Sequence, residues 1–130
     1  MTVGVLIITH DKFGDVVLNN TVHILGMCPL KTKTLSIPFN ADPDEMLSDA
    51  RALVHSLDEG EGVLVLTDMY GATPSNIAHR MVQSEPIRIV TGVNMPMIMR
   101  VMNYPALDLE QLVDKAINGG QEGVFINRRK

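Results

Sequence analysis

Residues 3–10 read VGVLIITH, an unbroken apolar run that ends on a polar pair, Thr9 and His10. A short run rich in β-branched residues is typical of a strand buried on both faces, as in a parallel sheet. In open sheets of this kind the ligand crevice lies beyond the carboxyl ends of the strands. His10 therefore lies where such proteins carry out their chemistry, and it can serve as a base, a metal ligand or a nucleophile.

The rest of the chain alternates strands with helices. Short apolar runs predict strands over residues 63–66 and 87–91, and a more polar strand is predicted over residues 32–37, as an edge position permits. Helical spacing of apolar residues predicts helices over residues 13–27, 42–57 and 73–82, a short one from Pro96 and a last one from Asp108. Such alternation is typical of a parallel sheet with right-handed crossovers. We predict an α/β fold with a doubly wound, mainly parallel sheet in the order 2-1-3-4 and helices on both faces, formed by a single domain over residues 1–130.

Two of the helix starts carry capping signals. Asp42 stands at the N-cap position of its helix, and Glu45, three residues later, completes a capping box. Asp108 and Gln111 have the same spacing at the start of the last helix. These pairs predict where the two helices begin.

The C-terminal part of the chain predicts a contact between two copies. Gly119 and Gly120 are expected to end the last helix, and residues 124–126, Val-Phe-Ile, to form a short final strand. A strand this short is not stable alone, and a sheet of four parallel strands leaves an edge that invites pairing. A strand exchanged with a symmetric partner covers that edge on both subunits, so we expect a homodimer.

The composition excludes several classes of protein. With 45% hydrophobic and 20% charged residues, the chain is typical of a globular domain rather than a disordered one. Its net charge of −4 argues against nucleic acid as the main partner, because binding to phosphates needs clustered Lys and Arg.

The first apolar run is too short to span a membrane and lacks the flanks of a signal peptide. The single cysteine, Cys28, excludes an internal disulfide and a cysteine-based metal site, and we expect it to be buried in a cytoplasmic protein.

Strand order places two ionisable residues together. Strands one and three are neighbours in the order 2-1-3-4, so His10 and Asp68, each at the carboxyl end of its strand, face each other across about 5 Å of sheet. A carboxylate beside an imidazole fixes one ring nitrogen as a hydrogen-bond donor and leaves the other with a free lone pair. This arrangement makes a histidine a directed nucleophile or base.

Two loops at the same edge supply candidate donors for an anion. Residues 70–74 and 92–96 each lead into a helix, and a helix N-terminus offers free N–H groups at the positive end of its dipole. The side chains that we expect to bind a phosphoryl group on His10 are Thr9, Thr73, Ser75 and Asn76. We assign no metal ligands and no cofactor, and the sequence has neither a P-loop nor a G-x-G-x-x-G motif.

Three motifs together resemble those of the enzyme IIA domain of the mannose/fructose family, in the bacterial phosphoenolpyruvate-dependent sugar phosphotransferase system. In chain order they are residues 7–10 (IITH), 68–76 (DMYGATPSN) and 92–97 (GVNMPM). The similarity spans nearly the whole chain. It implies a phosphotransferase with a phosphohistidine intermediate, in which His10 takes a phosphoryl group from phospho-HPr and passes it to an enzyme IIB component, in sugar uptake or its regulation.

The resemblance also implies roles for individual residues and partners. Asp68 would orient His10, and the hydroxyl of Thr73 would lie near the phosphate. Family members are homodimers that meet the membrane permease only indirectly. The chain departs from the family pattern at Thr73, where a serine is frequent, and at Asp11, where a small residue often follows the histidine. Thr73 keeps the hydroxyl, whereas an acidic Asp11 would repel the phosphoryl group and slow its transfer.

Three other interpretations remain open. A receiver domain phosphorylated on Asp68 would need an acidic pair after the first strand to hold Mg²⁺ and a lysine after a fifth parallel strand, but the chain has Thr9-His10 and Asn127 there. A mannose-IIA-like subunit of dihydroxyacetone kinase would share His10 and differ in its acceptor. A non-catalytic binding module would use only a methionine-rich rim for docking, formed by Met95, Met97, Met99 and Met102.

Overall fold

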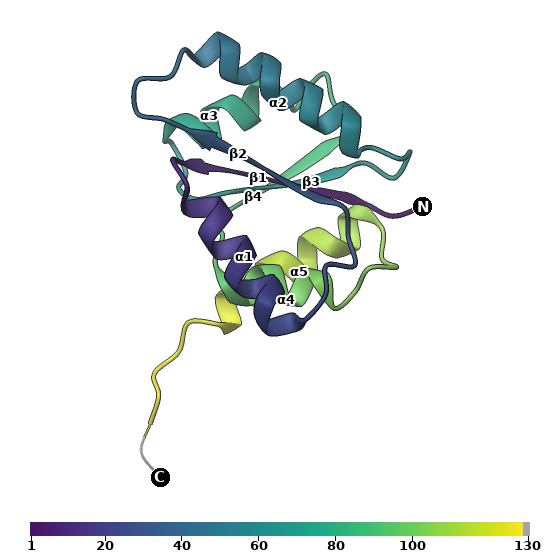
Figure 1. The fold of residues 1–130 in the computed structure, drawn as a ribbon. Helices are drawn as coiled ribbons and strands as arrows, with labels where there is room; N and C mark the ends of the chain where they lie inside the picture. The colour runs from purple at the N-terminus through teal and green to yellow at the C-terminus, as the bar shows by residue number, and fades with distance from the viewer. Residues whose placement is uncertain (129–130) are drawn as a thin grey trace.

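Within residues 1–128, which the computed structural model describes, four parallel strands form one sheet in the order β2-β1-β3-β4 (Figure 1). The strands are β1 (Gly4–His10), β2 (Thr32–Ile37), β3 (Val63–Thr67) and β4 (Ile87–Thr91). The predicted α/β class, the parallel pairing and the strand order are confirmed. β1 and β3 are the central strands, so their carboxyl ends lie side by side in the middle of the sheet.

Helices cover both faces of the sheet, and Figure 1 shows α2 and α3 on one face and α1, α4 and α5 on the other. Their bounds are α1 (Phe13–Leu25), α2 (Pro43–Leu57), α3 (Thr73–Arg80), α4 (Met95–Met102) and α5 (Leu109–Glu122). Because successive side chains of a strand point to opposite faces, β1 contributes to two cores. Val5 and Ile7 pack in the core with α1, α4 and α5, whereas Leu6 and Ile8 pack in the core with α2 and α3.

Several helix ends differ from their predictions. α1 ends at Leu25, two residues early, because Gly26 takes a left-handed φ of 81° and its N–H bonds to the Val22 carbonyl at 2.8 Å. α3 ends at Arg80 rather than at residue 82. Asp42 caps α2 as predicted, but it accepts from the N–H of Asp44, and the hydrogen bonds of the described residues include no reciprocal contact from Glu45.

The predicted capping box of α5 is confirmed. The Asp108 side chain accepts from the Gln111 N–H at 2.8 Å, and the Gln111 side chain accepts from the Asp108 N–H at 3.1 Å.

The prediction that Cys28 is buried is wrong, because Cys28 is exposed just after α1. No helix within the described part of the chain is long and apolar enough to cross a membrane.

The predicted end of α5 is wrong, and close packing explains why. The helix continues through Gly119 and Gly120 to Glu122. A Cβ at Gly119 would lie 2.4 Å from the Cβ of Arg100, and one at Gly120 would lie 2.9 Å from the Met97 methyl group. The two glycines therefore let α5 approach α4 closely, and do not cap the helix.

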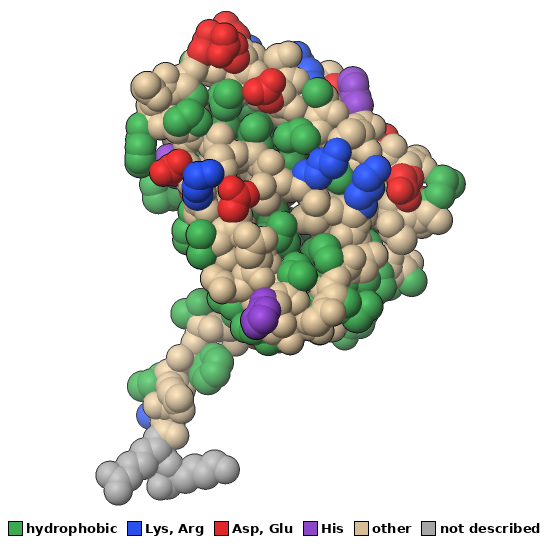
Figure 2. Space-filling view, in the orientation of Figure 1, with side chains coloured by type: hydrophobic (Ala, Val, Ile, Leu, Met, Phe, Trp, Pro, Cys, Tyr) green, Lys and Arg blue, Asp and Glu red, His purple; other side chains and the backbone are tan. Residues whose placement is uncertain are grey.

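The final strand predicted over residues 124–126 is not formed in the single chain. Val124, Phe125 and Ile126 are 77%, 77% and 68% exposed. Figure 1 shows this segment leaving α5 and extending away from the sheet, and Figure 2 shows hydrophobic side chains on it, apart from the body of the molecule. On the face of the body shown in Figure 2, Lys and Arg side chains form no extended patch.

Candidate functional site

The carboxyl ends of β1 and β3 bring His10 and Asp68 into contact. β1 ends at His10, and β3 ends at Thr67, one residue before Asp68. Asp68 Oδ2 accepts a hydrogen bond from the backbone N–H of His10 at 2.9 Å and lies 2.7 Å from its Nδ1. The other oxygen, Oδ1, accepts from the Met69 N–H at 2.9 Å. The side chain of His10 is 32% exposed and that of Asp68 12%, so the histidine faces solvent and the carboxylate lies behind it.

The surroundings of Asp68 keep it ionised. Partial burial acts to raise its pKa, but hydrogen bonds from the His10 backbone and side chain, the attraction of the imidazole in its protonated form and the Met69 N–H together lower the pKa below its usual 3.8. An ionised carboxylate only accepts hydrogen bonds. His10 Nδ1 is therefore the donor, and Nε2 carries the free lone pair.

An apolar rim surrounds the imidazole. His10 and Asp68 line an open cavity of about 410 Å³ together with Phe13, Met69, Gly92 and Val93. The Phe39 ring stands 5.9 Å from the His10 ring, centroid to centroid, at an angle of 31°. Phe13, Phe39 and Met69, which we call the apolar rim, are all exposed. The partly exposed imidazole inside this rim is open to solvent, and a molecule docked on the rim would exclude water from it.

The residue after His10 has an unusual backbone. Asp11 takes φ 42°, the left-handed region, and within residues 1–128 it is the only residue other than glycine with a positive φ. Its N–H donates to the Ile37 carbonyl at the end of β2, at 2.9 Å. This turn ends β1 and directs the chain into α1.

The hydroxyl of Thr9, a predicted phosphate ligand, is engaged with the backbone. Thr9 is buried, and its Oγ1 accepts from the Gly14 N–H at 2.7 Å and donates to the His10 carbonyl at 3.3 Å. A Cβ at Gly14 would lie 2.9 Å from this oxygen. Thr9 therefore links the end of β1 to the first turn of α1, and it does not line the cavity of His10.

The other three predicted ligands lie at the start of α3. Thr73 is the first residue of the helix and is exposed, and its hydroxyl has no hydrogen-bond partner among the described residues. Ser75 is buried and Asn76 exposed, and both line a neighbouring cavity of about 270 Å³ that His10 does not reach. The Asn76 amide donates to the Gly71 carbonyl at 3.3 Å. His10 and Asp68 thus share one cavity, whereas Ser75 and Asn76 belong to the next.

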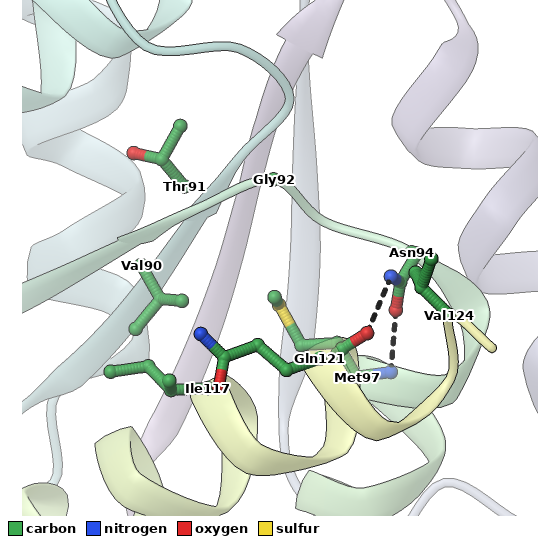
Figure 3. Close-up of a pocket in the computed structure, with 9 residues that line it drawn as sticks. Val90, Thr91, Gly92, Asn94, Met97, Ile117, Gln121 and Val124 are labelled. Atoms are coloured by element: carbon green, nitrogen blue, oxygen red, sulfur yellow. Dashed lines mark hydrogen bonds between the residues drawn. The ribbon is translucent and has the colours of Figure 1, made fainter.

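A third cavity, of about 490 Å³, opens between β4 and α5 (Figure 3). It shares Gly92 with the cavity of His10, and Val90, Ile117 and Val124 are among the apolar residues that line it. Asn94 lies at one end of it, where its Oδ1 accepts from the Met97 N–H at 2.8 Å and its Nδ2 donates to the Gly120 carbonyl at 3.2 Å (Figure 3). We call this cavity the β4 groove.

Two residues of the site were missed by sequence analysis. Phe39 sits in the loop after β2, where a lone aromatic residue between polar neighbours gave no pattern to interpret. Asn94 precedes the predicted helix start by two residues, and N-cap preference alone could have identified it.

Comparisons with known proteins match almost all of the chain. The model of the family described as "PTS system fructose IIA component" matches residues 4–117. The PTS system mannose-specific EIIAB component of Escherichia coli is 30% identical over 129 residues, in an alignment that covers 95% of this chain and 39% of the relative. The chain therefore spans about two fifths of the length of the curated relatives that it matches.

Solved structures show the same fold. The mannose/sorbose-specific IIA subunit from Enterococcus faecalis superposes with a TM-score of 0.88 at 22% identity, covering 100% of this chain and 98% of the other. The PTS IIA protein associated with the fucose utilization operon of Streptococcus pneumoniae superposes with a TM-score of 0.78 at 25% identity, covering 95% and 91%.

Proposed function

Because the chain belongs to the family of PTS system fructose IIA components, we propose that it is a phosphocarrier whose His10 accepts a phosphoryl group from phospho-HPr and passes it to an enzyme IIB component. The observation that carries this proposal is the 2.7 Å contact between His10 Nδ1 and Asp68. It leaves a nucleophilic Nε2 on a partly exposed ring. The proposed role is in sugar uptake or its regulation.

The transfer follows from the protonation of the two residues. Nε2 attacks the phosphorus of the donor phosphohistidine in line with the bond that breaks, and the donor ring keeps the electron pair of that P–N bond. The Nδ1 proton stays between His10 and Asp68 throughout. Since phosphorylation makes the His10 ring cationic, the Asp68 carboxylate stabilises the charge as it forms.

Onward transfer uses the same geometry in reverse. A nucleophile of the IIB component attacks the phosphorus, the bond from Nε2 breaks, and His10 recovers its lone pair. The low pKa of Asp68 supports this cycle because the carboxylate need not change its protonation state.

We propose different roles for the four polar residues in binding the phosphoryl group: direct contact, contact from the neighbouring cavity, and support through the backbone. Thr73, with an exposed hydroxyl at the N-terminus of α3, is the proposed direct donor. Ser75 and Asn76 would contribute from the neighbouring cavity. Thr9 would act through the backbone, by holding the turn that carries His10.

We also propose that the protein is a homodimer in which residues 124–126 of each copy lie on the β4 edge of the other. β4 is an edge strand with one neighbour, β3. The β4 groove beside it has an apolar side, and the exposed Val124, Phe125 and Ile126 are an apolar segment without a core of their own. Pairing between two copies would cover the open edge of β4 and remove the apolar segment from water.

One experiment tests the chemistry. The protein is incubated with phosphoenolpyruvate, enzyme I and HPr, and its intact mass is measured. We expect one added phosphate that is labile to acid and stable to alkali, as a phosphoramidate is, and that is absent from His10→Ala. An alkali-labile acyl phosphate on Asp68 would instead support a receiver, although the described residues lack the fifth strand that a receiver needs.

A further inference from the structure

Phe39 is held against the nucleophile by a loop that starts beside it. His10 is paired with Ile37 in the register of β1 and β2, and Phe39 follows two residues later. Its ring centroid is 5.9 Å from that of the imidazole, at an angle of 31°. The separation is within the range of about 4.5–7 Å that aromatic pairs prefer, and the two rings are tilted.

Core packing does not explain this position. Phe39 is 89% exposed, so its side chain removes little apolar surface from water in the free protein. The aromatic contact of this ring within the described residues is the one with His10. A role of this ring is therefore to be sought at the site of His10, because the ring stands beside the imidazole.

The contact adds a constraint that Asp68 cannot supply. The hydrogen bond to Asp68 fixes Nδ1 at 2.7 Å, but a single bond leaves the imidazole able to tilt about it. The Phe39 ring, which stands beside the imidazole and is tilted by 31° to it, limits that tilt on its own side. The two contacts together fix the plane of the ring and the direction of its free Nε2.

We propose that Phe39 is a positioning residue for phosphoryl transfer, a role that rests on the proposed function of His10. The ring directs Nε2 along the line of attack, where small misalignments cost much rate. The Phe39 ring also lies beside a ring that becomes cationic on phosphorylation. An aromatic side chain can form a cation–π interaction with that ring, whereas an aliphatic side chain cannot.

The test compares Phe39→Leu with Phe39→Tyr in single-turnover transfer from phospho-HPr over a range of donor concentrations. Phe39→Leu should lower the saturating rate about three- to tenfold with little change in the half-saturating concentration. Phe39→Tyr should keep the parent rate. Tyr104→Leu, which removes an aromatic residue after the C-terminus of α4, is the matched control and should leave both values unchanged.

A spectroscopic measurement accompanies the kinetics. Loss of the neighbouring ring current in Phe39→Leu should shift the NMR signals of the His10 ring protons, and Phe39→Tyr should restore them. A loss confined to the half-saturating concentration would overturn the proposal and make Phe39 a docking contact. A leucine variant as fast as the parent, or a tyrosine variant as slow as leucine, would also overturn it. Failure of the proposed function is distinct, because the parent itself would then gain no phosphate on His10.

Discussion

A single oxygen of Asp68 contacts His10 twice. Asp68 Oδ2 is hydrogen bonded to the backbone N–H of His10 at 2.9 Å and to the Nδ1 of its ring at 2.7 Å. One atom therefore joins the end of β1 to the end of β3 and also sets the tautomer of the imidazole. The position of the imidazole and its tautomer therefore depend on the same carboxylate oxygen.

Asp68→Asn should keep the fold and slow the transfer. An amide oxygen can still accept from the two N–H groups, but it brings no charge to stabilise the cationic ring. A hydrogen bond to a charged group is worth about 1.5–3 kcal/mol, so we expect a loss of roughly ten- to a hundredfold in single-turnover rate. A variant as fast as the parent would show that the carboxylate plays no part in the reaction.

The same pair predicts how stability depends on pH. The folded state lowers the pKa of Asp68, so its contribution is fully present above the unfolded value near 3.8 and is lost as the pH falls through the lower folded value. The difference in free energy of unfolding between the parent and Asp68→Asn should shrink as the pH falls through this acid range. Urea titrations at several pH values measure it, and a difference that grew on acidification would contradict the assignment.

Gly119→Ala should destabilise the packing of α5 on α4. The new methyl group would lie 2.4 Å from the Arg100 Cβ, which is fixed to the backbone, so we expect a cost of about 1–3 kcal/mol despite the better helix propensity of alanine. Gly120→Ala is the matched control, because it meets the movable end of Met97 at 2.9 Å and should cost less. Equal thermal stabilities for the two variants would argue against this account of the glycines.

Deleting the chain from Gly123 onward should weaken the proposed dimer. The truncated protein keeps the groove residues on β4, α4 and α5, but it loses Val124 from the groove and the apolar segment that would cover the groove of the other copy. Light scattering over a dilution series of both proteins tests the idea. A full-length monomer at micromolar concentration, or a truncated form that is equally dimeric, would refute the exchanged segment and leave the chemistry of His10 unaffected.

The strand order and the pairing of His10 with Asp68 could be predicted because they follow from periodicity and topology. Apolar runs and helical stripes give the order of elements, and the doubly wound rule then puts the ends of β1 and β3 together. The capping box at Asp108 was equally accessible, since both of its contacts are local.

Contacts that depend on side-chain packing or on the path of a loop could not be predicted in this way. A glycine that ends a helix and a glycine that admits a neighbouring helix are identical in sequence, so Gly119 was misassigned. The hydroxyl of Thr9 was expected to face a ligand, but strand alternation turns it toward Gly14. The contact of Phe39 with His10 depends on the path of a loop, which no periodic pattern records.

The left-handed turn at Asp11 limits which amino acids this position can accept. Branched and bulky side chains are disfavoured there, whereas Gly, Asn and Asp all adopt this conformation. Asp carries a negative charge that Gly and Asn lack, and all three adopt the same left-handed backbone conformation. A change of charge next to His10 is therefore compatible with the backbone turn that carries this histidine, so position 11 can differ in charge while the backbone conformation stays the same.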